Sequence, residues 1–347
     1  MSNPLKVIDI SKPEDTVIED LLDAAVNQGF LFVDGHDFQQ AEVDTLFDLS
    51  SDFFTKTPGE EKQKYEINKN NIGYTGFTTE QLDPRKTRDF KEGYNFGFVN
   101  FKTGEFNQSE DRYYGRTDID NANENPVPPL FEKNSGIISE TTRKLHRIAL
   151  KILELITVAL QVEDRRFFVD RHRPEEPSGC VFRMLRYPLI REDDLEEAKQ
   201  ANPDVDPTIR AGAHTDYGSL TLLFQRQGQQ GLQLQMGDKD WVEVPFVKSQ
   251  HEGSAPPLVV NFGDLLSYWT NGLLKSTIHR VKFSPGETRT SDRYSIVFFV
   301  HPENATQLTP VPSKLVRDAG GGIEPTAITA LEHLNQRLAD TYASINY

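Results

Sequence analysis

Cysteine is almost absent from the sequence, with Cys180 the single example among 347 residues. One thiol excludes an internal disulfide and a cysteine-based metal cluster, so any metal ion must be held by histidines and carboxylates. We expect Cys180 to be a small buried side chain rather than a nucleophile.

Targeting and membrane segments are also missing. The N-terminus has no basic segment followed by a long apolar stretch, and nowhere do about 18 apolar residues run together. We therefore expect no signal peptide, no membrane span and a cytoplasmic location.

Basic residues are fewer than acidic ones. The chain has 38 Lys and Arg against 53 Asp and Glu, so its formal charge is 38 − 53 = −15. An acidic surface repels a phosphate backbone, and no Lys/Arg-rich run provides a local exception, so we expect no nucleic-acid partner. The hydrophobic fraction of 37% is enough for a sizeable core and excludes global disorder.

The first part of the chain alternates helical patterns with irregular sequence. Apolar residues from Val17 to Ala25 and from Val43 to Phe54 repeat at helical spacing, and Phe30 to Val33 indicates a buried strand. The segment PGEEK indicates a surface break, and Asn68 to Pro129 is polar, aromatic and irregular. We predict a helical and irregular N-terminal region over residues 1–129, in which the long irregular segment includes a lid.

The second part is mainly β. A helix at residues 130–162 has one apolar face and is expected to support a sheet. Short β-type runs then follow, separated by Pro, Gly, Asn and Asp turns. They predict a double-sheet jelly roll over residues 178–302, and a C-terminal helix follows at residues 323–347. The fold class is therefore mainly β with flanking helices.

Three residues could form a metal site. His214 and Asp216 are two apart in RAGAHTDYGS, so on an extended chain their side chains point to one face. His279, in the β-type run KSTIHRVKF, could come from a neighbouring strand. Two histidines and one carboxylate form the facial triad of non-haem Fe(II) oxygenases, which leaves coordination positions open for a chelating 2-oxo acid and for O2.

A second group could bind a carboxylate. Arg293 and Ser295 are two apart in RYSIVFFV and share one face of a strand. A guanidinium and a hydroxyl side by side can hold the far carboxylate of a five-carbon 2-oxo diacid, with Tyr187 as a third donor.

These motifs occur in a recognisable order. RAGAHTDYGSLTLLFQ is followed by GLQL, by VVNFGDLLSYWTNGLLKSTIHRV and by RYS, while GFLFVDGHDF and NIGYTGF add looser similarity in the N-terminal half. The chain resembles the isopenicillin-N-synthase-like family of Fe(II)/2-oxoglutarate-dependent oxygenases over nearly its whole length. It is most similar to the fungal small-molecule branch that includes thymine hydroxylases.

The resemblance implies a double-stranded β-helix, with His214, Asp216 and His279 as iron ligands. It also implies that Arg293 and Ser295, helped by Tyr187, hold 2-oxoglutarate. It makes four further residues structural: Gly212, Gly218, Gly263 and Asp264. No catalytic side chain beyond the metal ligands is predicted.

The sequence departs from the family pattern near the substrate. Leu185-Arg186-Tyr187-Pro188 replaces an Asn-Tyr-Tyr-Pro-like segment, and Cys180 stands where the resemblance suggests a polar residue in thymine hydroxylases. The second departure weakens the transfer of pyrimidine activity to this chain.

We predict oxidation, and specifically hydroxylation, of a small molecule with release of succinate and CO2. Five residues are candidates for contact with the substrate: Arg183, Tyr217, Phe299, Tyr94 and Phe96. A structural ion pair for Arg183 and core packing for each aromatic residue are the alternatives. The other histidines, His301 included, are expected to be structural.

Two other functions stay open. One is an iron oxidase of the same family that does not use 2-oxoglutarate, of the oxidative-cyclase or ethylene-forming type. The other is a non-catalytic binding protein with the same fold. The sequence does not determine the primary substrate, the oligomeric state or the metabolic pathway.

Overall fold

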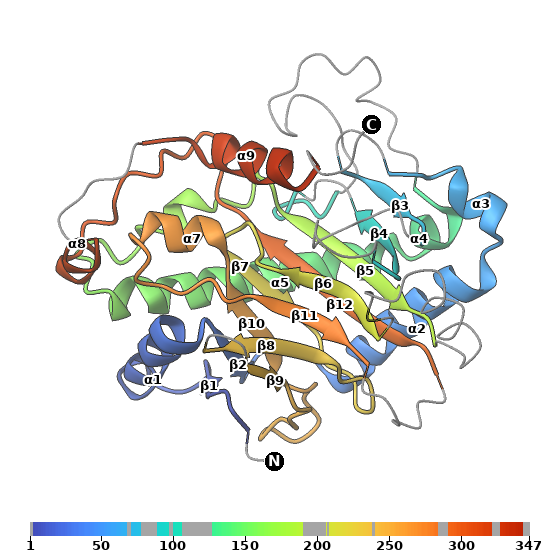
Figure 1. Ribbon diagram of the computed structural model, residues 1–347, viewed down its shortest axis with the longest axis horizontal. Coiled ribbons are helices and arrows are strands. Elements are labelled where there is room, and N and C mark those ends of the chain that lie inside the picture. The colour runs from blue at the N-terminus through green and yellow to red at the C-terminus, as the bar shows by residue number, and fades with distance from the viewer. Residues whose placement is uncertain are drawn as a thin grey trace.

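Two β-sheets face each other at the centre of the molecule (Figure 1). The computed structural model describes residues 3–67, 71–77, 89–96, 100–105, 127–189, 206, 208–237, 240–283, 291–320 and 327–342. The larger sheet has eight strands in the order β1-β2-β10-β7-β12-β5-β4-β3, and the smaller has four in the order β6-β11-β8-β9. Of the pairings between these strands, β1 with β2 is parallel and the others are antiparallel.

The strands of the larger sheet are β1 (Val7–Asp9), β2 (Phe30–Asp34), β3 (Gly73–Thr75), β4 (Glu92–Phe96), β5 (Val181–Tyr187), β7 (Leu220–Leu223), β10 (Leu258–Phe262) and β12 (Arg293–Val300). Those of the smaller sheet are β6 (Ile209–His214), β8 (Leu232–Met236), β9 (Asp240–Glu243) and β11 (His279–Lys282). This architecture confirms the predicted class, mainly β with a jelly-roll core and flanking helices.

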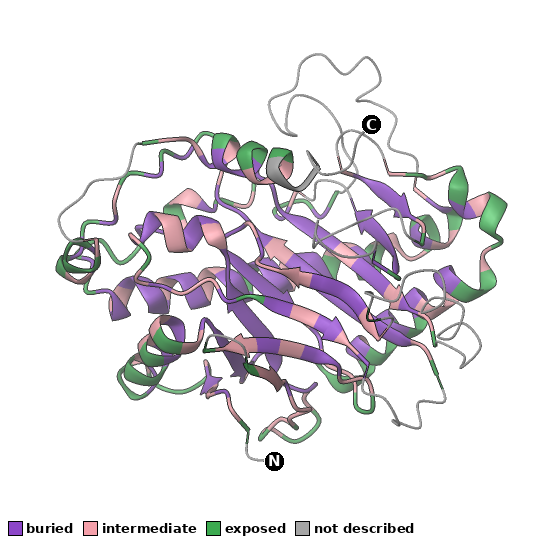
Figure 2. Cartoon of the chain, in the orientation of Figure 1, coloured by how far each residue is buried: buried purple, intermediate pink, exposed green. Residues whose placement is uncertain are grey.

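The described α-helices are α1 (Ile18–Asp23), α2 (Gln40–Lys56), α3 (Gly59–Gln63), α4 (Pro129–Lys133), α5 (Ser135–Ala159), α7 (Asp264–Trp269), α8 (Lys314–Ala319) and α9 (Ala330–Tyr342). Of these, α2 and α5 pack on the outer face of the larger sheet, so its central strands are buried on both faces (Figure 2). In β12, Ile296 and Phe298 join the core on the helical side, and Val297 and Phe299 face the smaller sheet. This period of two gives each strand one face for the core and one for the site.

The N-terminal region differs from its prediction in two ways. It contributes β1 to β4 to the larger sheet, so the strands at both edges of that sheet come from residues before the predicted core, and the strand predicted at Phe30 to Val33 is confirmed as β2. The segment PGEEK is not a plain break, because its last four residues belong to α3. Much of the segment predicted to include a lid, namely 68–70, 78–88, 97–99 and 106–126, lies outside the described residues.

The supporting helix is formed as predicted, except that Asn134 divides it into α4 and α5. Asn134 has φ −107° and ψ 21°, and its side-chain amide donates to the Leu130 carbonyl oxygen at 2.8 Å, which ends the first helix. Among the described helices, none is both long and apolar enough to cross a membrane.

Candidate metal centre and cavity

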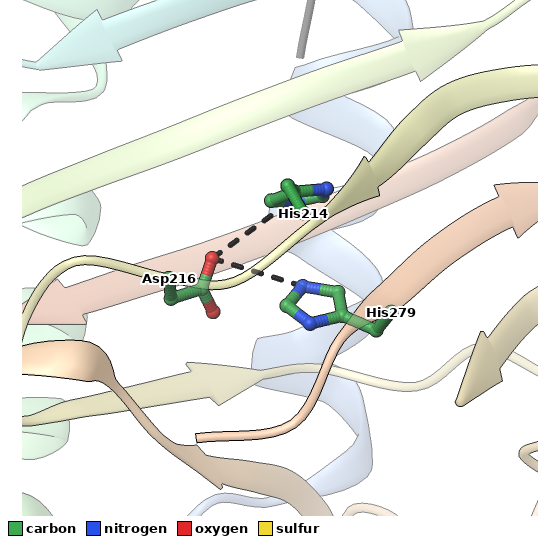
Figure 3. A group of neighbouring side chains, drawn as sticks. All are labelled: His214, Asp216 and His279. Atoms are coloured by element: carbon green, nitrogen blue, oxygen red, sulfur yellow. Dashed lines mark ion pairs between the residues drawn. The ribbon is translucent and has the colours of Figure 1, made fainter. Parts of the chain in front are cut away.

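His214 and His279 lie opposite each other on neighbouring strands. His214 is the last residue of β6 and pairs directly with His279, the first residue of β11. Their ring centroids are 4.3 Å apart. Asp216 follows two residues after His214, and its Oδ1 lies 3.8 Å from His214 Nε2 and 3.7 Å from His279 Nε2 (Figure 3). One ligand atom from each residue lies within 4.8 Å of the others, so the three could hold a metal ion.

Hydrogen bonds fix the orientation of all three side chains. The Nδ1 of His214 contacts the Gly212 carbonyl oxygen at 2.8 Å, and that of His279 contacts the Thr277 carbonyl oxygen at 3.1 Å. Since a carbonyl only accepts, each Nδ1 is the donor in its contact, and Nε2 is the ring nitrogen that faces the proposed metal position.

The carboxylate is oriented by the larger sheet. Thr221, on β7, donates its hydroxyl proton to Asp216 Oδ2 at 2.6 Å, and the amide of Asn261, on β10, donates to the same oxygen at 2.8 Å. Because both donors occupy Oδ2, they turn Oδ1 toward the two imidazoles.

The electrostatics suit a cation. Burial and the neighbouring His279 lower the pKa of His214 to about 3, which keeps the imidazole neutral. Burial opposes ionisation of Asp216, but His279, His214 and the two donors outweigh it and lower the pKa of that carboxyl. Two imidazoles and one carboxylate fit the donor set of a divalent iron site.

The segment that contains His214 and Asp216 is closely packed against neighbouring backbone. A Cβ on Gly218 would lie 2.3 Å from the Val300 carbonyl oxygen, and one on Gly263 would lie 2.3 Å from the Gly218 carbonyl oxygen. Asp264 accepts from the Thr215 hydroxyl at 2.9 Å and pairs with Arg337 of α9 at 2.8 Å. The structural roles that the resemblance implied for these residues agree with their contacts.

The triad opens into a cavity of about 190 Å³ between the two sheets. Arg293, Ser295 and Tyr187 line it as well. Arg293 and Tyr187 are direct partners on β12 and β5, and the guanidinium carbon lies 4.9 Å from the centroid of the Tyr187 ring. Arg293 Nη1 donates to Ser295 Oγ at 2.5 Å, and Arg293 is 5% exposed. The predicted carboxylate-binding group is therefore assembled beside the metal site.

The candidate substrate residues divide into two sets. Arg183, Tyr217 and Phe299 line the cavity, and their contact with a substrate stays a prediction. The prediction for Tyr94 and Phe96 is wrong, because both lie in the core, with ring centroids 4.9 and 4.8 Å from that of Phe131 on α4. They belong to the face of β4 that is turned toward the helices.

Asn95, between those two aromatic residues, lines the cavity instead. Its side-chain amide donates to the backbone and side-chain oxygens of Asn71 at 3.0 and 3.1 Å. This fixes the amide orientation, and within the described part of the chain the buried Oδ1 has no hydrogen-bond donor. Because side chains alternate between the two faces of a strand, assigning Tyr94 and Phe96 to the core would have predicted that Asn95 faces the cavity.

Residues outside the strands also line the cavity. Leu334 and Leu338 of α9 are among them, as are Lys91 and His301. Sequence reasoning missed the two leucines and the lysine, because helical spacing does not show which neighbour a helix covers. Burial and the neighbouring His333 and His172 lower the pKa of His301 to about 3.

Cys180 is buried, as predicted, and burial raises its pKa to about 11. Its sulfur contacts the backbone of His301, and it packs in the core. The cavity is instead lined by its neighbours Gly179 and Val181. Because the Cys180 side chain packs in the core and does not line this cavity, its identity says nothing for or against a pyrimidine substrate here.

Comparison with known proteins identifies relatives across the chain. The model of the 2OG-Fe(II) oxygenase superfamily matches residues 180–302, and a model described as the N-terminal region of the non-haem dioxygenase in morphine synthesis matches residues 5–116. A UPF0676 protein of Schizosaccharomyces pombe is 32% identical over 96% of this chain and 92% of its own length. The 2-oxoglutarate-dependent dioxygenase citB of Monascus ruber is 28% identical over 94% and 89%.

Solved structures with a similar fold also match nearly the whole chain. Thymine hydroxylase of Neurospora crassa, in complex with alpha-KG and thymine, superposes with a TM-score of 0.75 at 26% identity and covers 97% of both chains. The same protein with alpha-KG alone gives a TM-score of 0.74.

Proposed function

This chain belongs to the 2OG-Fe(II) oxygenase superfamily, and we propose that His214, Asp216 and His279 are the residues that hold its iron ion. The protein is accordingly a 2-oxoglutarate- and Fe(II)-dependent dioxygenase. The observation that supports the ligand assignment is that one ligand atom from each residue lies within 4.8 Å of the others, while both Nδ1 atoms are hydrogen-bonded to carbonyl oxygens.

The co-substrate would lie between the triad and Arg293. Its far carboxylate would meet the Arg293 guanidinium and the Ser295 hydroxyl, and Tyr187 would pack beside them. When bound, iron and 2-oxoglutarate supply oxygen activation, with release of succinate and CO2. The residues of this chain contribute orientation and a cavity shielded by two sheets.

For the substrate we propose a small, flat molecule with two complementary polar groups. Arg183 would donate to a carbonyl or anionic oxygen, and Asn95 Oδ1 would accept from an N–H or O–H group. Arg183 and Asn95 are direct partners on β5 and β4, so the donor and the acceptor lie side by side. Three apolar side chains, Phe299, Leu334 and Leu338, also line the cavity.

A nucleobase-like ring satisfies this pattern, and the related thymine hydroxylase was solved with thymine bound. We therefore place such rings first in a substrate screen, and hydroxylation of an exocyclic carbon first among the reactions. The cytoplasmic location and the lack of a nucleic-acid partner remain predictions.

An anaerobic titration tests the assignment. The apo-protein receives Fe(II) and then 2-oxoglutarate, and the visible metal-to-ligand charge-transfer band is recorded. We expect the band in the wild type, its loss in His279→Ala, and a higher 2-oxoglutarate requirement in Arg293→Ala. Iron binding without a band in the wild type would favour an oxidase that does not use 2-oxoglutarate. Absence of iron binding would refute the ligand assignment and favour a binding protein.

The substrate proposal has its own test. Succinate release is measured over a panel of flat heterocycles, with Asn95→Leu and Arg183→Leu as variants. Each variant should raise the KM of the best substrate about tenfold or more, because the polar group of the substrate that would bond to the replaced side chain is then buried without a partner. A panel in which only aliphatic amines or acids stimulate succinate release would contradict the proposed substrate class.

A further inference from the structure

The loop between β7 and β8 contacts Arg293, which is paired with Tyr187 of β5. The carbonyl oxygen of Gln229 accepts a hydrogen bond from Arg293 Nε at 2.9 Å. Because Nη1 of the same guanidinium is bound to Ser295, two of its three nitrogens have fixed partners. A planar guanidinium held at two nitrogens keeps its plane as well as its position.

The side chain of Gln229 holds the backbone on both sides of Arg293. Its Oε1 accepts from the backbone N–H of Tyr294 at 2.8 Å, and its Nε2 donates to the carbonyl oxygen of Asp292 at 3.3 Å. One residue thus makes three hydrogen bonds to three consecutive residues, with Arg293 at their centre.

The loop itself has a defined conformation. The backbone N–H of Gln229 donates to the Arg226 carbonyl oxygen at 3.1 Å, which closes a turn. Gly228 within that turn has φ +78°, a conformation that a residue with a side chain rarely adopts. The turn therefore directs the Gln229 carbonyl toward the guanidinium.

The first residue before β12 is anchored from the other side too. Asp292 accepts from Arg186 Nε at 2.6 Å and from the Leu189 N–H at 2.8 Å. Arg293 consequently stands between a strand that fixes Asp292 and a loop that fixes both of its neighbours.

We propose that Gln229 is a positioning residue for 2-oxoglutarate, which sets the orientation in which Arg293 meets the far carboxylate. The inference rests on the proposed role of Arg293. A guanidinium recognises a carboxylate through two parallel hydrogen bonds, and this geometry is lost when the plane turns. Gln229 acts through Arg293 and not through contact with the co-substrate.

The test compares two glutamines of the same loop region. Gln229→Met removes both side-chain hydrogen bonds at similar volume. Gln225→Met is the matched control, since Gln225 also bridges backbone groups, with Nε2 to the Pro257 carbonyl oxygen at 2.6 Å and Oε1 to the Val247 N–H at 3.4 Å. The dissociation constant of 2-oxoglutarate is read from the anaerobic charge-transfer band and, on Fe(II)-free protein, from calorimetry.

We expect Gln229→Met to raise this dissociation constant about fivefold to tenfold, the effect of losing two hydrogen bonds that act on one group. The Fe(II) affinity should stay unchanged, and Gln225→Met should bind 2-oxoglutarate as the wild type does. Gln229→Glu, which keeps the acceptor for the Tyr294 N–H, should give an intermediate value and serves if Gln229→Met does not fold.

Two further results decide the inference. In the Arg293→Lys background, which lacks the planar fork, Gln229→Met should have no additional effect on 2-oxoglutarate binding. An unchanged dissociation constant in Gln229→Met, or an equal rise in Gln225→Met, overturns the inference while the role of Arg293 stands. Wild-type affinity in Arg293→Lys instead overturns the role of Arg293, and the inference with it.

Discussion

The orientation of the Asp216 carboxylate depends on two donors from the larger sheet, and one of them can be removed with little change of shape. Thr221→Val replaces a hydroxyl by a methyl group. The Thr221 hydroxyl donates to Asp216 Oδ2 at 2.6 Å, a length typical of a charge-assisted bond, and Thr221 is 5% exposed. Its loss leaves Asn261 as the remaining side-chain donor seen on that oxygen in the described part of the chain.

The size of the effect follows from two independent magnitudes. Hydrogen bonds to charged groups contribute about 1.5–3 kcal/mol. Loss of a partner that orients a metal ligand typically lowers metal affinity about 10- to 100-fold. Since about 1.4 kcal/mol corresponds to a tenfold change, the two agree. We therefore expect the Fe(II) affinity of Thr221→Val to fall about 10- to 100-fold.

Anaerobic competition with a chromophoric chelator measures that affinity. Thr157→Val is the matched control, because Thr157 on α5 is also buried and its hydroxyl donates to the Leu153 carbonyl oxygen at 2.7 Å. Both variants should fold, and the control should bind Fe(II) like the wild type. Unchanged Fe(II) affinity in Thr221→Val would refute the reasoning that the second carboxylate oxygen has to be held for the first to act as a ligand.

Three other predictions follow from the site and its surroundings. Fe(II) at about 100 times its dissociation constant should stabilise the protein by about 2.7 kcal/mol in urea unfolding, and His279→Ala should show no such gain; equal stabilisation of both would place the metal elsewhere. Burial lowers the pKa of His146 to about 3 and of His172 to about 4, so below about pH 6.5 the unfolded chain binds more protons than the folded chain. For each histidine, the free energy of unfolding should therefore decrease by about 1.4 kcal/mol for every unit by which the pH is lowered in this range. Urea midpoints between pH 7 and 5 test this, and a flat profile would contradict it. Leu334→Ala should enlarge the substrate range in a succinate assay without changing 2-oxoglutarate binding; a shift in 2-oxoglutarate affinity alone would contradict the placement of α9.

The convergence of the three candidate metal ligands could be predicted because it depends mainly on local spacing in the sequence. His214 and Asp216 are two residues apart, and a strand converts that spacing into a shared direction. His279 needed one further assumption, that its β-type run pairs with the first strand, and the register of β11 with β6 satisfies it directly. Arg293 and Ser295 were found by the same local rule.

The cavity walls were harder to predict, because they depend on which face of each element meets which neighbour. On β4 the aromatic residues look like contacts for a substrate, yet Tyr94 packs against Phe131 and leaves the cavity face to Asn95. The contribution of α9 comes from a helix far along the chain from the strands it covers. Neither result follows from spacing alone, since both are decided by tertiary packing.

The two histidines of the candidate metal centre and the proposed carboxylate-binding Arg293 belong to different sheets. A packing change between the sheets should therefore affect iron binding and 2-oxoglutarate binding differently. His214 and His279 are neighbours within the smaller sheet, whereas Arg293 is part of the larger one. Asp216 joins them, since it follows β6 yet receives its hydrogen bonds from the larger sheet.

An apolar cluster that includes Leu185, Val281 and Val297 holds the sheets together beside the cavity. Because His214 and His279 are paired within one sheet, loss of a side chain from this cluster leaves the distance between the two imidazoles unchanged. The same loss lets the two sheets shift relative to each other, which changes the distance between the proposed iron ligands and Arg293 that 2-oxoglutarate would span. Val281→Ala should therefore weaken 2-oxoglutarate binding more than Fe(II) binding, and the opposite order would show that the two sheets do not move as separate units.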